Sequence, residues 1–249
     1  MQSVKKAAFF FDLDNTMFDY EASFKKASLF AFHTITNNIP ENKPLEDKWF
    51  VYYKGYCDLY WPLYEKELIS RQEYQKRRLL SSFEAIGLRN ICAEQVQHYQ
   101  NVFEKSVPLK AEPFVWIKEI VHQLDQLGII FGIISNGDSL IQREKIKNLK
   151  IHIPETEIYI SSELNIAKPD PGIFHLVKNS TNAEVYHYVG DAFELDIVPA
   201  VQAGWTAIWW NPLKQPAEVD TYCHFNCSSG SELIEIIKRC IESAGYSLH

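Results

Sequence analysis

The sequence predicts an α/β fold in which a mostly parallel sheet is covered by helices on both faces. The first observation is a set of short, wholly apolar segments, such as 7–11 and 129–134, each followed directly by polar residues. Segments of this kind are typical of strands that are buried on both faces of a parallel sheet. The second observation is that, after Pro113, such segments alternate with helical patterns, which is the order expected of strand–helix–strand units.

Composition limits the class of protein. The chain has 249 residues, 46% of them hydrophobic, which suffices for one large α/β domain or for a core domain with an insert. A formal net charge of −7, without a dense block of Lys or Arg, argues against a nucleic acid polymer as the main partner. Five cysteines with irregular spacing indicate free thiols rather than a zinc site. No stretch reaches the length of a membrane span or of a signal peptide, so we expect a cytoplasmic protein without a membrane partner.

The first apolar segment, 7–11, leads directly into Asp12 and Asp14. Two carboxylates this close repel each other, and a hard divalent cation such as Mg²⁺ relieves that repulsion with oxygen ligands. A solvated turn after a strand is the alternative for this stretch taken alone, because Asp and Asn are common turn residues.

The region from 17 to 108 has a helical pattern and no convincing strand. Helices are expected over 22–35, through the aromatic-rich stretch 45–64 with a kink or an end at Pro62, from the Ser70–Glu73 capping box to Gly87, and over 93–105. We interpret the aromatic residues as packing between helices rather than as a base-stacking surface. Four helices are too many for a simple crossover. The sequence therefore predicts a helical cap domain at 17–108, inserted into an α/β core domain formed by 1–16 and 109–249.

The remaining chain predicts the rest of the core. A helix over 114–127 precedes the strand at 129–134, a polar helix follows at about 140–149, and a helix begins just after the Lys168-Pro-Asp-Pro segment. Further strands are expected at 157–160, 185–189, 206–210 and 222–225, and Ser231 is expected to cap the final helix.

Polar residues follow several of these predicted strands. Because the carboxyl ends of parallel strands share one edge of a sheet, the groups are expected to converge there: Asp12, Asp14, Ser135, Asn136, Lys168 and Asp191. Each has an ordinary alternative when taken alone, such as a turn residue, an exposed loop lysine or a helix cap. We expect Asp196 either to support the site by holding residues that contact the ligand or to favour the first turn of its helix.

Together, these groups meet the requirements of phosphoryl transfer. Asp12 is the expected nucleophile, which would form an aspartyl-phosphate, and Asp14 is the expected general acid and base. Mg²⁺ would be held by Asp12, Asp191 and the backbone carbonyl of Asp14. Lys168, Ser135 and backbone N–H groups around Asn136 would bind the phosphate oxygens.

The same residues resemble the motifs of the haloacid dehalogenase-like (HAD) superfamily. The first motif matches Asp12–Thr16, the second matches the strand that ends at Ser135, the third matches Lys168, and the fourth matches Gly190-Asp191 with Asp196. The resemblance covers nearly the whole chain and implies a Rossmann-like core with a C1-type helical cap. It also implies that Asp12 is the nucleophile, Asp14 the acid/base, Ser135 and Lys168 the phosphate ligands, and Asp191 a metal ligand.

The resemblance leaves several activities open. The chain looks most similar to bacterial 5′-nucleotidases of the pyrimidine type, which implies hydrolysis of a nucleoside 5′-monophosphate or another small phosphorylated metabolite. Phosphoglycolate phosphatases, sugar-phosphate phosphatases and sugar phosphomutases share the same core. Dehalogenases of the family lack the second carboxylate of the first motif, so Asp14 disfavours that activity, and phosphonatases need a cap lysine that the sequence does not identify. A non-catalytic binding protein is disfavoured because no motif residue is missing.

Overall fold

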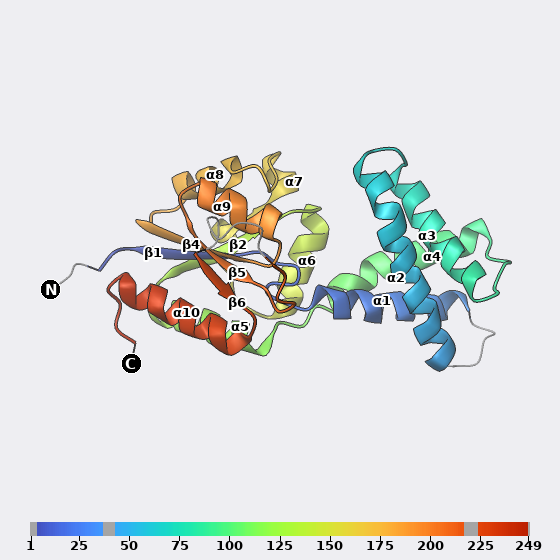
Figure 1. Cartoon of the computed structure of the whole chain (residues 1–249), viewed down its shortest axis with the longest axis horizontal. Coiled ribbons are helices and arrows are strands. Elements are labelled where there is room, and N and C mark those ends of the chain that lie inside the picture. Colours follow the sequence, from blue (N-terminus) through green and yellow to red (C-terminus); the bar gives the residue numbers. More distant parts are fainter. Residues whose placement is uncertain (1–3, 37–42, 217–223, 249) are drawn as a thin grey trace. The chain divides into compact units, whose positions relative to one another are not determined.

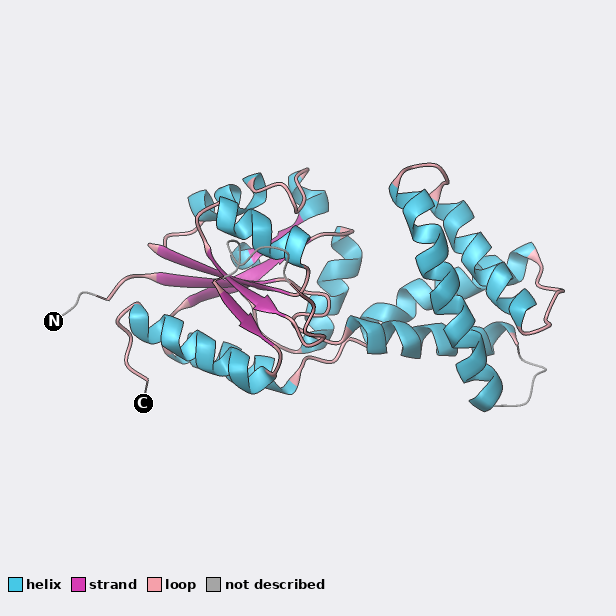
Figure 2. Ribbon diagram, viewed as in Figure 1, coloured by secondary structure: helices cyan, strands magenta, loops and turns pink. Residues whose placement is uncertain are grey.

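The computed structural model of the chain describes residues 4–36, 43–216 and 224–248. It divides into two compact units, Met1–Tyr20 with Ala111–His249, and Glu21–Lys110. The strands described all belong to the larger unit, and the smaller unit is helical (Figure 2). The cap domain assigned to 17–108 stays a prediction. Within the described residues, no helix has both the length and the apolar character required to cross a membrane.

The larger unit is built on a six-stranded sheet with the order β3-β2-β1-β4-β5-β6. β1 (Ala7–Phe11) lies in the interior of the sheet, between β2 (Ile130–Ser135) and β4 (Val185–Gly190), and every pairing is parallel. The other strands are β3 (Ile158–Ile160), β5 (Thr206–Trp210) and β6 (Phe225–Cys227). The predicted α/β class with a parallel sheet is confirmed.

Helices cover both faces of this sheet (Figure 1). α5 (Val115–Gln126) and α10 (Gly230–Ser243) lie on one face, and α8 (Gly172–Ser180) and α9 (Val198–Gln202) lie on the other. The other helices described in this unit are α6 (Ser139–Leu149) and α7 (Ser161–Leu164), with a 3₁₀ turn at Glu155–Glu157 and a π-helical turn at Phe193–Ile197.

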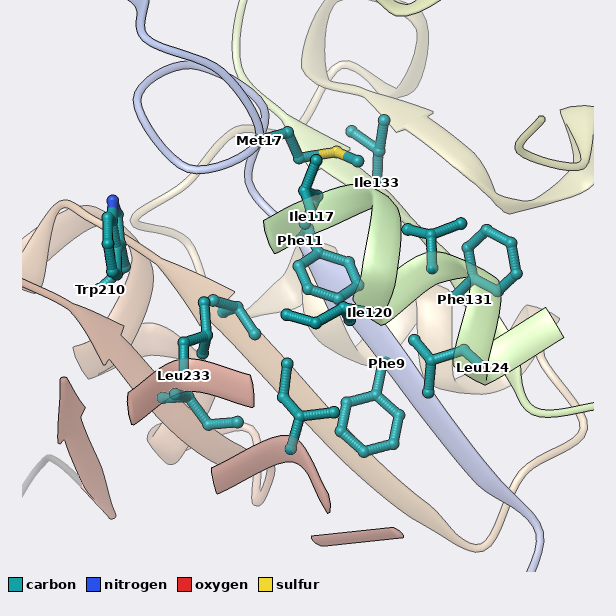
Figure 3. Close-up of a cluster of buried hydrophobic side chains, with 14 of the residues drawn as sticks. Phe9, Phe11, Met17, Ile117, Ile120, Leu124, Phe131, Ile133, Trp210 and Leu233 are labelled. Carbon is teal, nitrogen blue, oxygen red and sulfur yellow. The ribbon is translucent and has the colours of Figure 1, made fainter. Parts of the chain in front are cut away.

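The side chains of β1 explain this layering. Successive residues of a strand point to opposite faces, so Phe9 and Phe11 join the buried cluster under α5 and α10, whereas Phe10 joins the cluster under α8 and α9. Figure 3 shows Phe9 and Phe11 packed among side chains of α5 such as Ile120. Both faces of β1 are therefore buried, as its continuous apolar sequence predicts.

The smaller unit is a set of helices around an aromatic core. Its helices are α1 (Tyr20–Ile35), α2 (Lys43–Glu65), α3 (Arg71–Ala85) and α4 (Ala93–Leu109). Trp49 and Tyr53 are fully buried, with ring centroids 4.9 Å apart, and the Trp49 indole N–H donates to Ser82 Oγ at 3.0 Å. For these residues, the interpretation of the aromatic stretch as helix packing is confirmed, while Tyr52 and Trp61 are partly exposed.

Several helix and strand ends differ from the sequence-based expectation. α2 continues past Pro62 to Glu65, and α4 extends to Leu109 with Pro108 in its last turn. Each proline removes one i→i−4 hydrogen bond, and each helix ends within three residues of it. The predicted Ser70 cap is confirmed, since its hydroxyl accepts from the Glu73 amide at 3.1 Å. The final helix, however, is capped by Ser229 and not by Ser231. The last strand is Phe225–Cys227, and residues 222–223 of the expected strand lie outside the described residues.

A buried histidine in β4 makes folding sensitive to acid. The ring of His187 stacks on Phe9 at 4.3 Å, and neither ring nitrogen has a hydrogen-bond partner in the described chain. Burial, followed by the charge of His224, lowers the pKa of His187 to about 4. The unfolded chain takes up this proton below its ordinary pKa of 6.5, but the folded chain does not.

We predict that the free energy of unfolding falls as the pH decreases from about 6.5 to about 4, by up to roughly 3 kcal/mol from this residue. Urea unfolding at several pH values, for the natural chain and for His187→Phe, measures the effect. The variant keeps the stacked ring and should lose this part of the pH dependence. An identical pH dependence in both proteins would contradict the assignment.

Candidate active site

Three of the predicted site residues lie at the carboxyl ends of neighbouring strands. Asp12 follows β1, Ser135 is the last residue of β2, and Asp191 follows β4. The backbone N–H of Asp12 donates to the Val189 carbonyl at 2.8 Å, which extends the pairing of β1 with β4. The parallel order of the strands therefore brings these side chains to one edge of the sheet, where open α/β folds bind their ligands.

Lys168 connects this edge to the helix beyond β4. Its Nζ atom lies 2.6 Å from Asp12 Oδ1, 2.6 Å from Asp196 Oδ1 and 2.8 Å from the Tyr188 hydroxyl. The residue is only 5% exposed, which excludes the alternative of an exposed loop lysine. Lys168 is thus a buried cation that donates to two carboxylates, and both of these hydrogen bonds are short.

Asn136 places Lys168 in this position. Its side-chain amide donates to the Lys168 carbonyl at 2.8 Å, and its Oδ1 atom accepts from the Lys168 backbone N–H at 3.0 Å. The amide group therefore pairs with one residue of the loop in the way that a neighbouring strand would. The predicted phosphate contact of Asn136 involves its backbone region, so the side chain has a separate structural role that the sequence did not reveal.

Burial dominates the electrostatics of these groups. It raises the pKa of Asp12 well above its usual value, an effect that Lys168 opposes and Asp196 reinforces. Burial, followed by the charge of Asp196, raises the pKa of Asp191 to about 7. For Lys168, burial alone would lower the pKa, but Asp12 and Asp196 together raise it. Three carboxylates thus face one ammonium group, which leaves a local excess of negative charge.

The arrangement of carboxylate oxygens fits a hard divalent cation. One oxygen each from Asp12, Asp191 and Asp196 lies within 4.8 Å of the other two. Mg²⁺ binds through one or two carboxylates and keeps several waters, so the two expected ligands in this group, Asp12 and Asp191, would suffice to hold it. The carboxylate of Asp14 is not in this group; the expected contribution of Asp14 is its backbone carbonyl, which stays a prediction.

Asp196 reaches Lys168 from the turn that follows β4. It belongs to the π-helical turn Phe193–Ile197, and its Oδ2 atom accepts from the Ala192 N–H at 3.0 Å while Oδ1 contacts Lys168. Asp196 thus forms an ion pair with Lys168, and its role in supporting the site stays a prediction. Gly190 makes room for it, since a Cβ atom at this position would lie 2.5 Å from the Asp196 Cβ.

The side chain of Asp14 is held by α6. Lys145 Nζ lies 2.8 Å from both Asp14 oxygens, and Gln142 Nε2 lies 3.1 Å from Asp14 Oδ2. Both α6 residues are almost fully buried. Neither residue was predicted from the sequence to have a function.

A signal for these two residues is present in the sequence. Gln142, Lys145, Ile146 and Leu149 are spaced as one face of a helix, and all four are buried. Two polar residues on a buried helical face need partners inside the protein. This pattern would have identified Gln142 and Lys145, although not the carboxylate that they contact.

The site can now be compared with known proteins. The model of the haloacid dehalogenase-like hydrolase family matches residues 9–210. The chain belongs to this family. The superfamily resemblance stated from the motifs is therefore confirmed.

Several known proteins resemble the chain, the first of them over about half of the length of each. A glyceraldehyde 3-phosphate phosphatase of Methanocaldococcus jannaschii is 30% identical over 129 residues, which cover 51% of this chain and 57% of that relative. A protein of the same name from Pyrococcus furiosus is 27% identical and covers 92% of both chains. The magnesium-bound crystal structure of the HAD-hydrolase YfnB from Bacillus subtilis has a TM-score of 0.68 at 19% identity, covers 94% of this chain and 99% of that one, and supports the fold.

The close approach of Gly190 and Asp196 yields a prediction about stability. Gly190→Ala would drive its methyl group into Asp196 and displace that carboxylate from Lys168. We expect the free energy of unfolding to fall by about 1–3 kcal/mol, as for other overpacked sites, measured by urea unfolding. Gly55→Ala is the control: Gly55 lies in α2 with no atom in the way, and the change should be neutral or stabilising. Equal stability of Gly190→Ala and the natural chain would contradict the assignment.

Proposed function

We propose that this protein is a Mg²⁺-dependent phosphatase that hydrolyses a small phosphomonoester through an aspartyl-phosphate at Asp12. The observation that carries the proposal is the contact between Asp12 and Lys168, 2.6 Å long and buried among further carboxylates at the end of β1. A carboxylate next to a fixed cation suits attack on a phosphoryl group, because the cation neutralises charge on both the nucleophile and the phosphate.

The first step forms the covalent intermediate. One oxygen of Asp12 attacks phosphorus, the ester P–O bond breaks, and Asp14 gives a proton to the departing alkoxide. In the second step, Asp14 takes a proton from water, the resulting hydroxide attacks phosphorus, and the Asp12–phosphorus bond breaks. Inorganic phosphate and the free alcohol are the products, and both aspartates return to their starting states.

The phosphate is bound by groups at the ends of two strands and by Lys168. Ser135 Oγ and the backbone N–H groups around Asn136 would donate to the non-bridging oxygens, and Lys168 would neutralise part of their charge. Asp12, Asp191 and the carbonyl of Asp14 would hold Mg²⁺, with Asp196 oriented beside them. When bound, the ion neutralises negative charge on the phosphoryl oxygens.

The substrate proposal has two candidates. The relatives named as glyceraldehyde 3-phosphate phosphatases favour a small sugar phosphate. The nucleoside 5′-monophosphate remains the second candidate, and it rests on the resemblance of the motifs and helical insert alone. In both cases we assign the smaller unit the role of a C1-type cap that selects the alcohol part of the substrate, with the protein acting in the cytoplasm.

The chemistry is tested with p-nitrophenyl phosphate. The natural chain should hydrolyse it with Mg²⁺ and stop after addition of a chelator, and Asp12→Asn should abolish turnover because an amide is a poor nucleophile. Asp125→Asn, at an exposed position of α5, should retain full activity. Turnover by Asp12→Asn at the natural rate would overturn the covalent mechanism.

The substrate class is tested by measuring free phosphate released from a panel of metabolites. We expect the highest kcat/KM for triose and other small sugar phosphates, above nucleoside 5′-monophosphates. The reverse order would select the nucleotidase assignment. Isomerised sugar phosphate without release of phosphate would instead identify a mutase.

A further inference from the structure

Two residues of α6 contact the carboxylate of Asp14. Lys145 Nζ lies 2.8 Å from Oδ1 and 2.8 Å from Oδ2, and Gln142 Nε2 lies 3.1 Å from Oδ2. A carboxylate offers about four lone-pair positions. These contacts use one position of Oδ1 and both positions of Oδ2, which leaves one lone pair of Oδ1 for exchanging a proton.

The lysine of this ion pair lies in the interior of the larger unit, whereas the Asp14 side chain is 31% exposed. Lys145 is 4% exposed, and its Nζ lies 4.9 Å from the centre of the Tyr20 ring and 6.0 Å from that of Phe18. Of the described carboxylates, only that of Asp14 lies within 4.0 Å of Lys145 Nζ. Burying an ion pair seldom adds net stability, since the loss of hydration offsets the attraction. The lysine therefore needs an explanation other than stability.

Gln142 connects Asp14 to the residues that end β2. Its Nε2 atom lies 2.7 Å from Ser135 Oγ and 3.0 Å from the Asn136 carbonyl, besides its contact with Asp14. One amide group thus fixes the carboxylate after β1 relative to the hydroxyl at the end of β2. These two groups must act on the same phosphoryl group under the proposed function, one on the leaving oxygen and one on a non-bridging oxygen.

We propose that Lys145 and Gln142 are positioning residues that hold the Asp14 carboxylate, Lys145 at both oxygens and Gln142 at Oδ2, so that the remaining lone pair of Oδ1 transfers the proton in both steps. This inference rests on the proposed function. We call these contacts of Lys145 and Gln142 with Asp14 the clamp. Without the clamp, the side chain of Asp14 would rotate about its bonds in the turn that follows β1. Acid–base catalysis depends on such alignment, because a small displacement of the proton donor slows the reaction strongly.

Comparing two leaving groups distinguishes a loss of proton transfer from a general loss of structure. p-Nitrophenolate departs without a proton, whereas an alkoxide needs one. In Lys145→Met, Asp12 should still be phosphorylated rapidly by p-nitrophenyl phosphate, but removal of the phosphoryl group needs a base and should be slow. We therefore expect a burst of p-nitrophenolate equal to the enzyme concentration. An alkyl phosphate should show no burst, and its kcat should fall by about 10² with KM within threefold of the natural value.

The controls come from the same helix. Arg143 pairs with Glu163, away from Asp14, so Arg143→Met removes a charge from α6 without touching the clamp. Its kcat for both substrates and its time course of p-nitrophenolate release should match those of the natural chain. Gln142→Leu should show the pattern of Lys145→Met with a smaller loss of kcat, about tenfold. It also tests the proposal if Lys145→Met does not fold, which far-ultraviolet circular dichroism and thermal melting would reveal.

Three outcomes would overturn the inference: unchanged kcat in folded Lys145→Met and Gln142→Leu, equal losses for the aryl and alkyl substrates without a burst, or a loss confined to KM. Failure of the proposed function looks different. In that case the natural chain hydrolyses neither substrate, or Asp12→Asn remains active. An active natural chain, an inactive Asp12→Asn and an unaffected Lys145→Met would refute the clamp alone.

Discussion

The structure depends on keeping several carboxylates buried beside one another at the end of a parallel sheet. Asp12, Asp191 and Asp196 would repel strongly in a medium that screens charge less than water does. Lys168 neutralises part of this charge, and its contacts with two of the carboxylates are among the shortest in the larger unit. The apolar strands and the glycine beside Asp196 maintain this arrangement.

The rigidity of the surroundings follows from the same constraint. β1 is enclosed on both faces by aromatic and aliphatic side chains, so the backbone that carries Asp12 has little freedom to move. Charged groups that need a fixed separation are best placed on such a support, because a preorganised site does not have to reorganise during the reaction. Tyr188 extends this support from the core to the charges: its ring is buried in β4, while its hydroxyl lies within hydrogen-bond distance of Lys168 and Asp196.

How much could be read from the sequence depends on the range of each interaction. The strands and the convergence of their carboxyl ends were predictable, because apolar runs and the parallel order are local or topological properties. The ion pair between Lys168 and Asp196 was not, since it depends on a π-helical turn that leaves no clear pattern. Lys145 and Gln142 lie on a recognisable buried face of α6, but their partner lies 131 and 128 residues away along the chain.

The amide of Asn136 has one more consequence. It forms two hydrogen bonds with the backbone of Lys168. These bonds attach the loop that carries Lys168, which contributes no strand, to the end of β2. Any distortion that tilts β2 would be passed mechanically to the buried ammonium group, and through it to Asp12. The carboxylate of Asp12 and the ammonium group of Lys168 would then move together, which preserves the distance between them when the outer strands of the sheet fluctuate.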